Sequence, residues 1–139
     1  MAWGTPETYC FGCNPDHRIG LRLTPDIDGD TARARWTPTH ENEGPPGLAH
    51  GGLTMAALDE VMTLLTRHGL DGYWVTGTLT VRLVGGLPVD QQHTIEARVD
   101  RVEGRKAFLS GRVVAADGST AAEAEGIWIE TPGAVTTGP

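Results

Sequence analysis

The sequence predicts an α+β fold in which one long, buried helix is wrapped by an antiparallel sheet of five or six strands. Two observations lead to this expectation. One segment, from Gly51 to about His68, carries apolar residues at helical spacing, and the segments that follow it alternate as strands do. A helix that is apolar on nearly every side has to be covered by the sheet, because the pattern offers no second helix to pack on it.

Size and charge restrict the class of protein further. The 139 residues, 39% hydrophobic and 21% charged, have the length and composition of one globular domain. The formal net charge of −7 disfavours nucleic acid and anionic membrane surfaces as partners. The most apolar run, 53–65, is shorter than the roughly 18 residues of a membrane span and contains Asp59 and Glu60. Because the first residues do not resemble a secretory signal, we expect a cytoplasmic protein.

The elements before the helix follow from turn residues and alternation. Residues 1–18 have prolines and no periodicity, which predicts an irregular lead-in. An alternating stretch begins at Leu21, and Thr31–Trp36 alternates small or apolar with mostly basic residues, so a hairpin is expected around the turn at 28–30. Three prolines and two glycines within 38–47 predict a long, stiff loop.

After the helix, strand-forming residues continue to the end of the predicted domain, which spans 19–130. They predict strands at 74–84, 93–102, 107–116 and 121–130. The tail, 131–139, is small and polar, and we expect it to be disordered. A hairpin, a buried helix and then an antiparallel sheet describe the hot-dog fold. Because one such layer leaves apolar surface and a strand edge uncovered, we expect a homodimer or a dimer of dimers.

The junction of the proline-rich loop and the helix reads His50-Gly51-Gly52. Glycines there let another backbone come close, and the first N–H groups of a helix lack helical partners and carry partial positive charge, so an oxyanion would be stabilised. Asp59 lies about two turns further on, inside the helix. Taken alone, His50 can be a helix cap and Asp59 a surface carboxylate beside Glu60, but their combination predicts a functional site.

The helix face that carries Asp59 is semi-polar. Met55, Thr63 and Thr66 share this face, at −4, +4 and +7, which indicates a polar stripe that faces a crevice. Glu60, by contrast, is expected to be an ordinary solvated or hydrogen-bonded surface carboxylate.

Cys10 and Cys13 form the one Cys-x-x-Cys pair of the chain, which supplies half of a zinc site at best. A redox pair of the thioredoxin type should open a helix after a strand, whereas Asn14 and Pro15 follow here. We therefore expect a partly buried structural pair of thiols, no metal and no cofactor.

Three stretches carry a resemblance to a known family. The run from His50 to Asp59, His-Gly-Gly followed by six residues and an aspartate, resembles the signature of hot-dog acyl-CoA thioesterases of the phenylacetate-pathway (PaaI-like) kind. The stretch 99–109 resembles the Val-Glu-Gly-Arg-Lys segment of the same superfamily, and 10–23 is similar to the N-terminal run of many bacterial members. The similarity covers residues 10 to 130, more than any single motif would.

The resemblance implies a thioesterase that acts on an acyl-CoA or another acyl thioester, with coenzyme A as part of the substrate. Gly51 would donate its amide N–H to the thioester carbonyl oxygen. Asp59 of the opposite subunit would activate water as general base or attack the carbonyl carbon. Thr76 falls where relatives carry a hydroxyl residue that faces this carboxylate, and it would position the water. We also expect His50 to be a catalytic residue and Gly52 to bind the substrate.

The resemblance also implies a binding region for coenzyme A. The basic turn around Gly104, Arg105 and Lys106, with Arg101 nearby, would meet the phosphates or the adenine, and the net negative charge of the chain makes such a local cluster necessary. Relatives often carry Asn or Gln six residues before the histidine, where this chain has Gly44. The neighbouring residues Asn42 or Glu43 would then take that role.

Two other functions fit parts of the sequence. Asn14-Pro15-Asp16-His17 resembles the second half of the Asp-x-Asn-Pro-x-His loop of hot-dog enoyl-thioester hydratases, but Gly12 stands where the aspartate is required. A non-catalytic acyl-thioester binding protein is the other alternative. Such a protein has no need of a carboxylate in a buried helix.

Overall fold

The computed structural model describes residues 8–132, so the first part of the lead-in and nearly all of the expected disordered tail lie outside the described residues. The elements are β1 (Asp26–Asp28), β2 (Thr31–Trp36), the 3-10 turn η1 (His40–Asn42), α1 (Gly51–Gly69), β3 (Tyr73–Leu83), β4 (His93–Glu103), β5 (Lys106–Val114) and β6 (Thr120–Thr131). The six strands form one antiparallel sheet in the order β1-β2-β4-β5-β6-β3.

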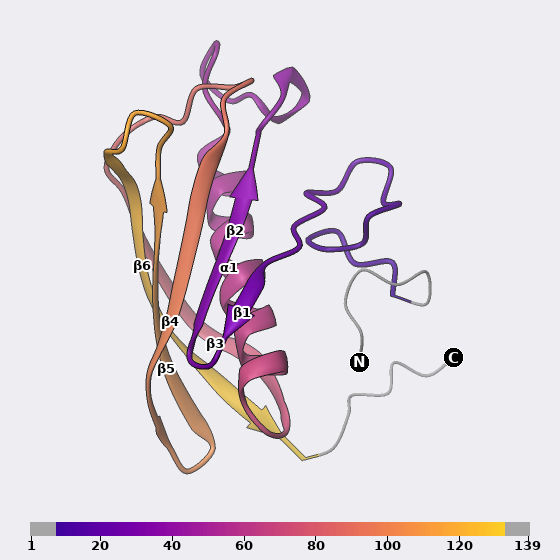
Figure 1. The fold of residues 1–139 in the computed structure, drawn as a ribbon, viewed down its shortest axis with the longest axis vertical. Helices are drawn as coiled ribbons and strands as arrows, with labels where there is room; N and C mark the ends of the chain where they lie inside the picture. Colours follow the sequence, from indigo (N-terminus) through magenta and orange to yellow (C-terminus); the bar gives the residue numbers. More distant parts are fainter. Residues whose placement is uncertain (1–7, 133–139) are drawn as a thin grey trace.

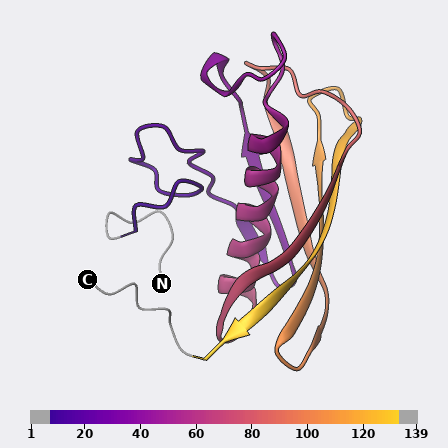
Figure 2. The same cartoon turned by 180° about the vertical axis from the view of Figure 1, so that it is seen from behind.

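The sheet curves around α1, which lies against its concave face (Figures 1 and 2). Helix side chains such as Leu58, Met62 and Leu65 are fully buried against Ile95 and Trp128 from the sheet. β3 follows the helix in sequence but pairs with β6, so it becomes one free edge of the sheet. The predicted fold class, one long helix wrapped by an antiparallel sheet of five or six strands, is confirmed, and the sheet has six strands.

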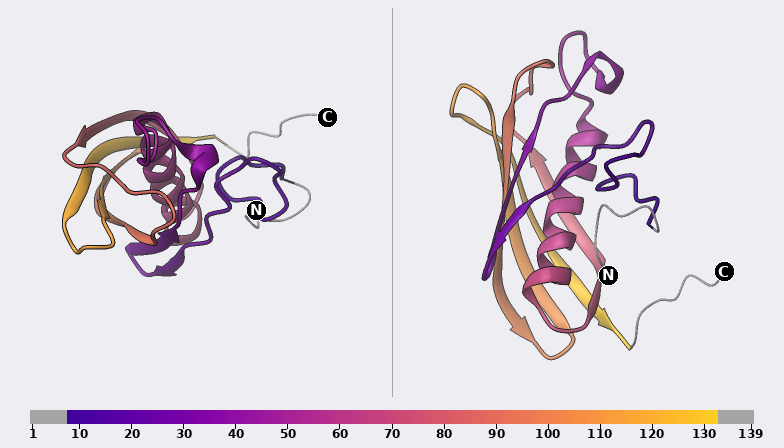
Figure 3. Two further views of the ribbon diagram at one scale, coloured as in Figure 1. Left: turned by 90° about the horizontal axis from the view of Figure 1, so that it is seen from above. Right: turned by 45° about the vertical axis from the view of Figure 1, so that its right-hand side comes forward.

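One flank of the helix remains uncovered by the sheet. Gly52 and Met55 are exposed and Asp59 is half-buried. A second flank is covered by the segment 8–25, which packs beside α1 on the side away from the sheet (Figure 3) and buries Leu21 and Leu23. The expectation of a helix buried on nearly every side is thus met within one chain except along the Asp59 flank.

The predicted first strand starts too early. Leu21 and Leu23 do alternate with exposed residues, but their backbone N–H groups donate to the carbonyls of Phe11 and Gly12 at 2.8 Å, and Arg22 has a φ of 54°. They therefore pair with the lead-in, and the hairpin strand begins only at Asp26. The bounds of the helix and of the other strands agree with the prediction to within two residues.

In the described part of the chain, no helix combines the length and the apolar character that crossing a membrane requires.

Candidate active site

Asp59 and Thr76 meet where the helix lies beside the edge strand. The Thr76 hydroxyl donates to Asp59 Oδ1 at 2.7 Å. The register of β3 against β6 shifts between Thr76 and Thr78, so a bulge follows Thr76 in the strand. One carboxylate oxygen of Asp59 is thereby held, and the other remains for a further partner.

Two buried residues stand behind this pair. Trp128 Nε1 donates to Thr63 Oγ1 at 2.9 Å, and Thr63 Oγ1 lies 3.4 Å from Thr76 Oγ1. An indole N–H can only donate, and the single hydroxyl proton of Thr76 points to Asp59, so Thr63 must donate to Thr76. The hydrogen bonds therefore run in one direction, from Trp128 through Thr63 and Thr76 to the carboxylate.

The sequence indicated only part of this arrangement. Thr63 was recognisable from its position four residues after Asp59 on one helix face. Trp128 carried no such signal, because it lies 65 residues from Thr63 and reaches it only through the packing of β6 on the helix.

His50 caps the helix. Its Nδ1 accepts from the Gly52 N–H at 2.9 Å, and its carbonyl accepts from the N–H groups of Leu53 and Thr54, both at 3.0 Å. Among the described residues, the Gly51 amide is then the one N–H of the first turn left without a partner. Of the residues at this junction, the structure thus leaves Gly51 free to bind an oxyanion and uses His50 and Gly52 in the cap.

Gly51 and Asp59 lie far apart within one chain. They are eight residues apart on the same helix, which corresponds to about 12 Å along its axis. An oxyanion donor and a base or nucleophile both have to lie about 3 Å from the reacting group. Gly51 and Asp59 of one chain therefore cannot serve the same carbonyl.

Asn42 and Glu43 are engaged in their own loop. Asn42 Oδ1 accepts from the Thr39 N–H at 2.8 Å, and Glu43 Oε1 lies 3.2 Å from His40 Nδ1. The Asn42 carbonyl accepts from the His50 N–H at 2.8 Å, which holds the start of the helix in place. The structure does not bring either side chain to Asp59.

The basic turn lies at the end of the sheet nearest Thr76 but not in contact with it. Lys106 pairs with Ile129, which pairs with Val75, so two strand spacings, about 10 Å, separate Lys106 from the residue before Thr76. Lys106 is exposed in the β4–β5 hairpin, and Gly104 forms its turn.

The neighbouring arginines make contacts within the hairpin and the sheet. Arg105 donates to the Glu130 carbonyl at 2.9 and 3.2 Å. Arg101 bonds to Glu103 at 3.0 Å and lies 3.8 Å over the Phe108 ring. None of these contacts reaches Asp59.

The loop that resembles the hydratase motif, residues 14–17, lies away from Asp59. His17 stacks on Tyr9 with ring centroids 4.2 Å apart, and its Nδ1 accepts from the Ile19 N–H at 3.3 Å. Asn14 is buried and binds backbone groups of its own loop. The loop approaches α1 at Glu60, through Cys10, and not at Asp59.

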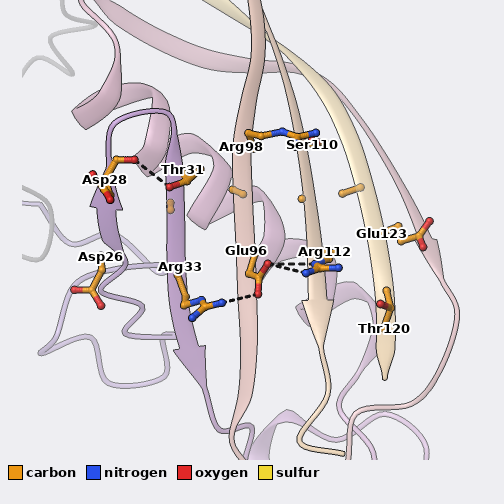
Figure 4. Close-up of a pocket in the computed structure, with 14 residues that line it drawn as sticks. Asp26, Asp28, Thr31, Arg33, Glu96, Arg98, Ser110, Arg112, Thr120 and Glu123 are labelled. Carbon is orange, nitrogen blue, oxygen red and sulfur yellow. Dashed lines mark hydrogen bonds and ion pairs between the residues drawn. The ribbon is translucent and has the colours of Figure 1, made fainter. Parts of the chain in front are cut away.

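A hollow of about 820 Å³ opens on the outer face of the sheet, which is turned away from α1 (Figure 4). Its most prominent charges are already paired across strands: Glu96 accepts from Arg33 at 3.0 Å and from Arg112 at 3.1 Å. The hollow does not include Asp59, Thr76 or the start of the helix.

Comparison with known proteins places these features in a family context. A family model described as the thioesterase superfamily matches residues 46–122, a segment that includes His50, Gly51, Asp59 and Thr76. The acyl-coenzyme A thioesterase THEM5 of Homo sapiens is 30% identical over 89 residues, which are 63% of this chain and 36% of that protein. The matched part of this chain thus corresponds to little more than a third of the curated relatives.

Solved structures share the fold. The crystal structure of a thioesterase superfamily protein matches with a TM-score of 0.81 and 26% identity, over 88% of this chain and 60% of that chain. The PaaI protein of E. coli, from the phenylacetic acid degradation operon, matches with a TM-score of 0.75 and 17% identity, over 81% and 82%. The hot-dog fold expected from the sequence, and the likeness to PaaI in fold, are confirmed.

Proposed function

Because this chain belongs to the thioesterase superfamily, we propose that it hydrolyses acyl-CoA or another acyl thioester at a site shared by two copies. The observation that carries this function is the Gly51 amide, which has no partner among the described residues and lies at the start of a helix of 19 residues. The curated relatives named acyl-coenzyme A thioesterases support coenzyme A as the thiol part of the substrate.

In the proposed reaction the thioester carbonyl oxygen accepts a hydrogen bond from Gly51. Asp59 of the other copy removes a proton from water as the water oxygen attacks the carbonyl carbon. The C–S bond then breaks, the thiolate leaves, and it takes up the proton from Asp59. A donor aimed at the oxyanion contributes about 3 to 4 kcal/mol, and a positioned base contributes roughly 10² to 10⁴-fold.

The alternative step is direct attack of Asp59 on the carbonyl carbon. It would form an anhydride with release of the thiolate, and water would then hydrolyse the anhydride. In both routes Thr76 holds one carboxylate oxygen and leaves the other for the reaction.

A second copy is required because Gly51 and Asp59 of one helix lie about 12 Å apart and cannot act on the same carbonyl group. β3 is a free edge of 11 residues, and the uncovered helix flank with Met55 runs beside it. Pairing of two β3 edges would join the sheets and place the two helices side by side and antiparallel. The start of one helix would then face Asp59 of the other, so a homodimer is the smallest proposed active unit, and two dimers could associate further.

Coenzyme A would enter from the end of the sheet that carries Arg105 and Lys106. Both are exposed in the β4–β5 hairpin, and Arg101 lies on the strand that leads into it. In a chain with a net charge of −7, a local group of cations is needed to hold the phosphates. Gly104, Arg105, Lys106 and Arg101 are therefore the proposed contacts for the coenzyme.

Gly51→Pro tests the oxyanion donor by removing one N–H group. Proline is favoured at the first position of a helix, and the preceding His50, with φ −61° and ψ 133°, already has the conformation that proline requires. We expect kcat to fall about 10² to 10³-fold with the helix content unchanged. Release of free thiol from short, medium-chain and aromatic acyl-CoAs measures kcat, and circular dichroism measures the fold.

Gly51→Ala is the matched control. It adds a similar Cβ, which would lie 2.8 Å from the flexible end of Leu83, but it keeps the N–H. We expect it to retain most of the activity. Equal activity of the proline and alanine variants would eliminate Gly51 as the donor, whereas a wild-type protein that hydrolyses no acyl thioester would overturn the proposed function itself.

A further inference from the structure

We propose that Cys10, Cys13 and Glu60 form a zinc site that fastens the N-terminal segment to α1. The two Sγ atoms and a carboxylate oxygen all lie within 4.8 Å of one another, and Cys10 Sγ lies 3.2 Å from Glu60 Oε1. Ligand atoms bonded to one tetrahedral zinc at 2.0 to 2.3 Å stand about 3.3 to 3.8 Å apart. The three ligand atoms would therefore have to move only slightly closer together to reach the spacing that a tetrahedral zinc ion requires.

The segment around the cysteines is built to close over Glu60. A Cβ at Gly12 would lie on the Glu60 side chain, within 2.3 Å of its Cγ, so only glycine allows the backbone to approach the carboxyl group this closely. The turn between the cysteines is held by the Asn14 N–H, which donates to the Cys10 carbonyl at 3.0 Å. Both sulfurs are thereby presented to a carboxylate that comes from the helix.

The charges in the group favour a cation. Cys13 is 2% exposed, and Cys10 and Glu60 are both partly buried. Cys10 Sγ lies 3.2 Å from Glu60 Oε1, so an ionised thiol and an ionised carboxyl group would stand side by side. Without a cation, two such neighbours cannot both be ionised at low cost, whereas a divalent ion stabilises thiolate and carboxylate together.

The chemistry of the ligands, two thiolates and one carboxylate, favours zinc. Thiolates prefer zinc over magnesium or calcium, and zinc accepts carboxylate oxygen as a further ligand. Among the described residues no fourth cysteine, histidine or carboxylate joins the group, so water would complete the coordination. The site is separate from the proposed active site, because Glu60 follows Asp59 by one residue and is rotated about 100° around the helix.

The sequence could not indicate this third donor. A Cys-x-x-Cys pair by itself supplies two ligands, and Glu60 lies 50 residues from Cys10. Glu60 was expected to be an ordinary surface carboxylate. This prediction was wrong in one respect, because Glu60 is half-buried under the N-terminal segment.

Metal content of the purified full chain tests the site. We expect about one zinc per chain by mass spectrometry after gel filtration, and loss of the metal in Cys10→Ser and Cys13→Ser. Glu60→Gln should keep both thiols but bind zinc at least tenfold more weakly in competition with a chromophoric chelator. Asp59→Asn, a change in the neighbouring carboxylate, is the matched control and should keep its zinc.

Cobalt provides a readout that does not depend on the variants folding. Reduced wild-type protein stripped of metal should take up Co²⁺ with a thiolate-to-cobalt charge-transfer band and the strong visible bands of tetrahedral cobalt. Removal of zinc by a chelator should lower the melting temperature, and added zinc should restore it. Reduced protein that binds neither ion, or purified protein whose thiols are joined in a disulfide, would overturn the zinc site.

Discussion

At the scale of single residues, the position of the Asp59 carboxylate depends on a chain of hydrogen bonds behind it. Its carboxylate accepts from Thr76, and Thr63 and Trp128 supply the donors behind that hydroxyl. Because each hydroxyl has one proton, the buried indole sets the direction of every later hydrogen bond. In the proposed mechanism, Thr63 and Trp128 are thus positioning residues, because they fix where the Thr76 proton points.

Thr63→Val tests this role because valine has the shape of threonine without the hydroxyl. Thr76 loses its donor and the Trp128 N–H loses its acceptor. Loss of a hydrogen bond of about 1 kcal/mol predicts a fall in kcat of about fivefold with KM little changed. The unpaired indole predicts a loss of about 1 to 3 kcal/mol in the free energy of unfolding.

Steady-state kinetics and urea unfolding measure the two effects, and two variants separate them. Thr63→Ser keeps a hydroxyl and should restore kcat. Thr66→Val removes another buried hydroxyl of the same helix, one that donates to the Thr63 carbonyl at 2.6 Å, and should affect stability alone. An equal loss of kcat in the Thr63 and Thr66 valine variants would contradict the positioning role.

At the scale of elements, three strands are joined on the outer face of the sheet by a row of charges. Arg33 on β2, Glu96 on β4 and Arg112 on β5 stand directly opposite one another in the register. Partial burial raises the pKa of Glu96, but hydrogen bonds from Arg33 and Arg112 outweigh it and hold the pKa below its ordinary value. The folded carboxylate therefore stays ionised at a pH where the unfolded one takes up a proton.

A pH-dependent contribution to stability follows. Since the folded pKa is lowered, the stabilisation is present above the unfolded pKa and is lost as the pH falls through the folded one. We expect Glu96→Gln to lower the free energy of unfolding by about 0.5 to 1 kcal/mol at pH 7, a small amount because both arginines are largely exposed.

Urea unfolding at pH 7 and at pH 3 measures the difference between wild type and variant, which should shrink in acid. Glu103→Gln, in a carboxylate paired with one arginine on its own strand, is the control and should cost less at pH 7. A difference that stays constant between the two pH values would show that the row contributes through packing rather than charge.

At the scale of the whole molecule, one chain carries both halves of the proposed site at separate places. The free amide is at the start of α1, and the carboxylate is about 12 Å further along the same helix. The uncovered flank of the helix and the free β3 edge are adjacent surfaces. Association through them would assemble two equivalent sites in each dimer.

Mixing of two inactive variants tests the shared site. Asp59→Asn should lower kcat at least tenfold, an effect of 1.4 kcal/mol or more on the barrier. In randomly assembled dimers of Asp59→Asn with Gly51→Pro, half are mixed and each mixed dimer holds one intact site, so about a quarter of wild-type activity should return on co-expression. Size-exclusion chromatography with light scattering reports the dimer. No recovery from mixed dimers would place Gly51 and Asp59 outside a common site.

The pattern of the sequence was sufficient for the fold. The bounds of α1 and of the later strands follow from periods of 3.6 and 2, which are local properties of the chain. Leu21 and Leu23 show the limit of this reasoning, because their alternation was real but their partners, Phe11 and Gly12, were not those of a sheet. Periodicity shows which residues face inward and does not show what they face.

The sequence by itself determined the one-helix, antiparallel-sheet architecture and the positions of Gly51, Asp59 and Thr76 in it. Only the tertiary structure decided that His50 caps the helix through Nδ1, that Trp128 supports Thr63, and that Glu60 meets the cysteines. The physical reason is that hydrogen bonds act over about 3 Å, and residues 50 or 65 apart in sequence reach that distance only after the core has packed.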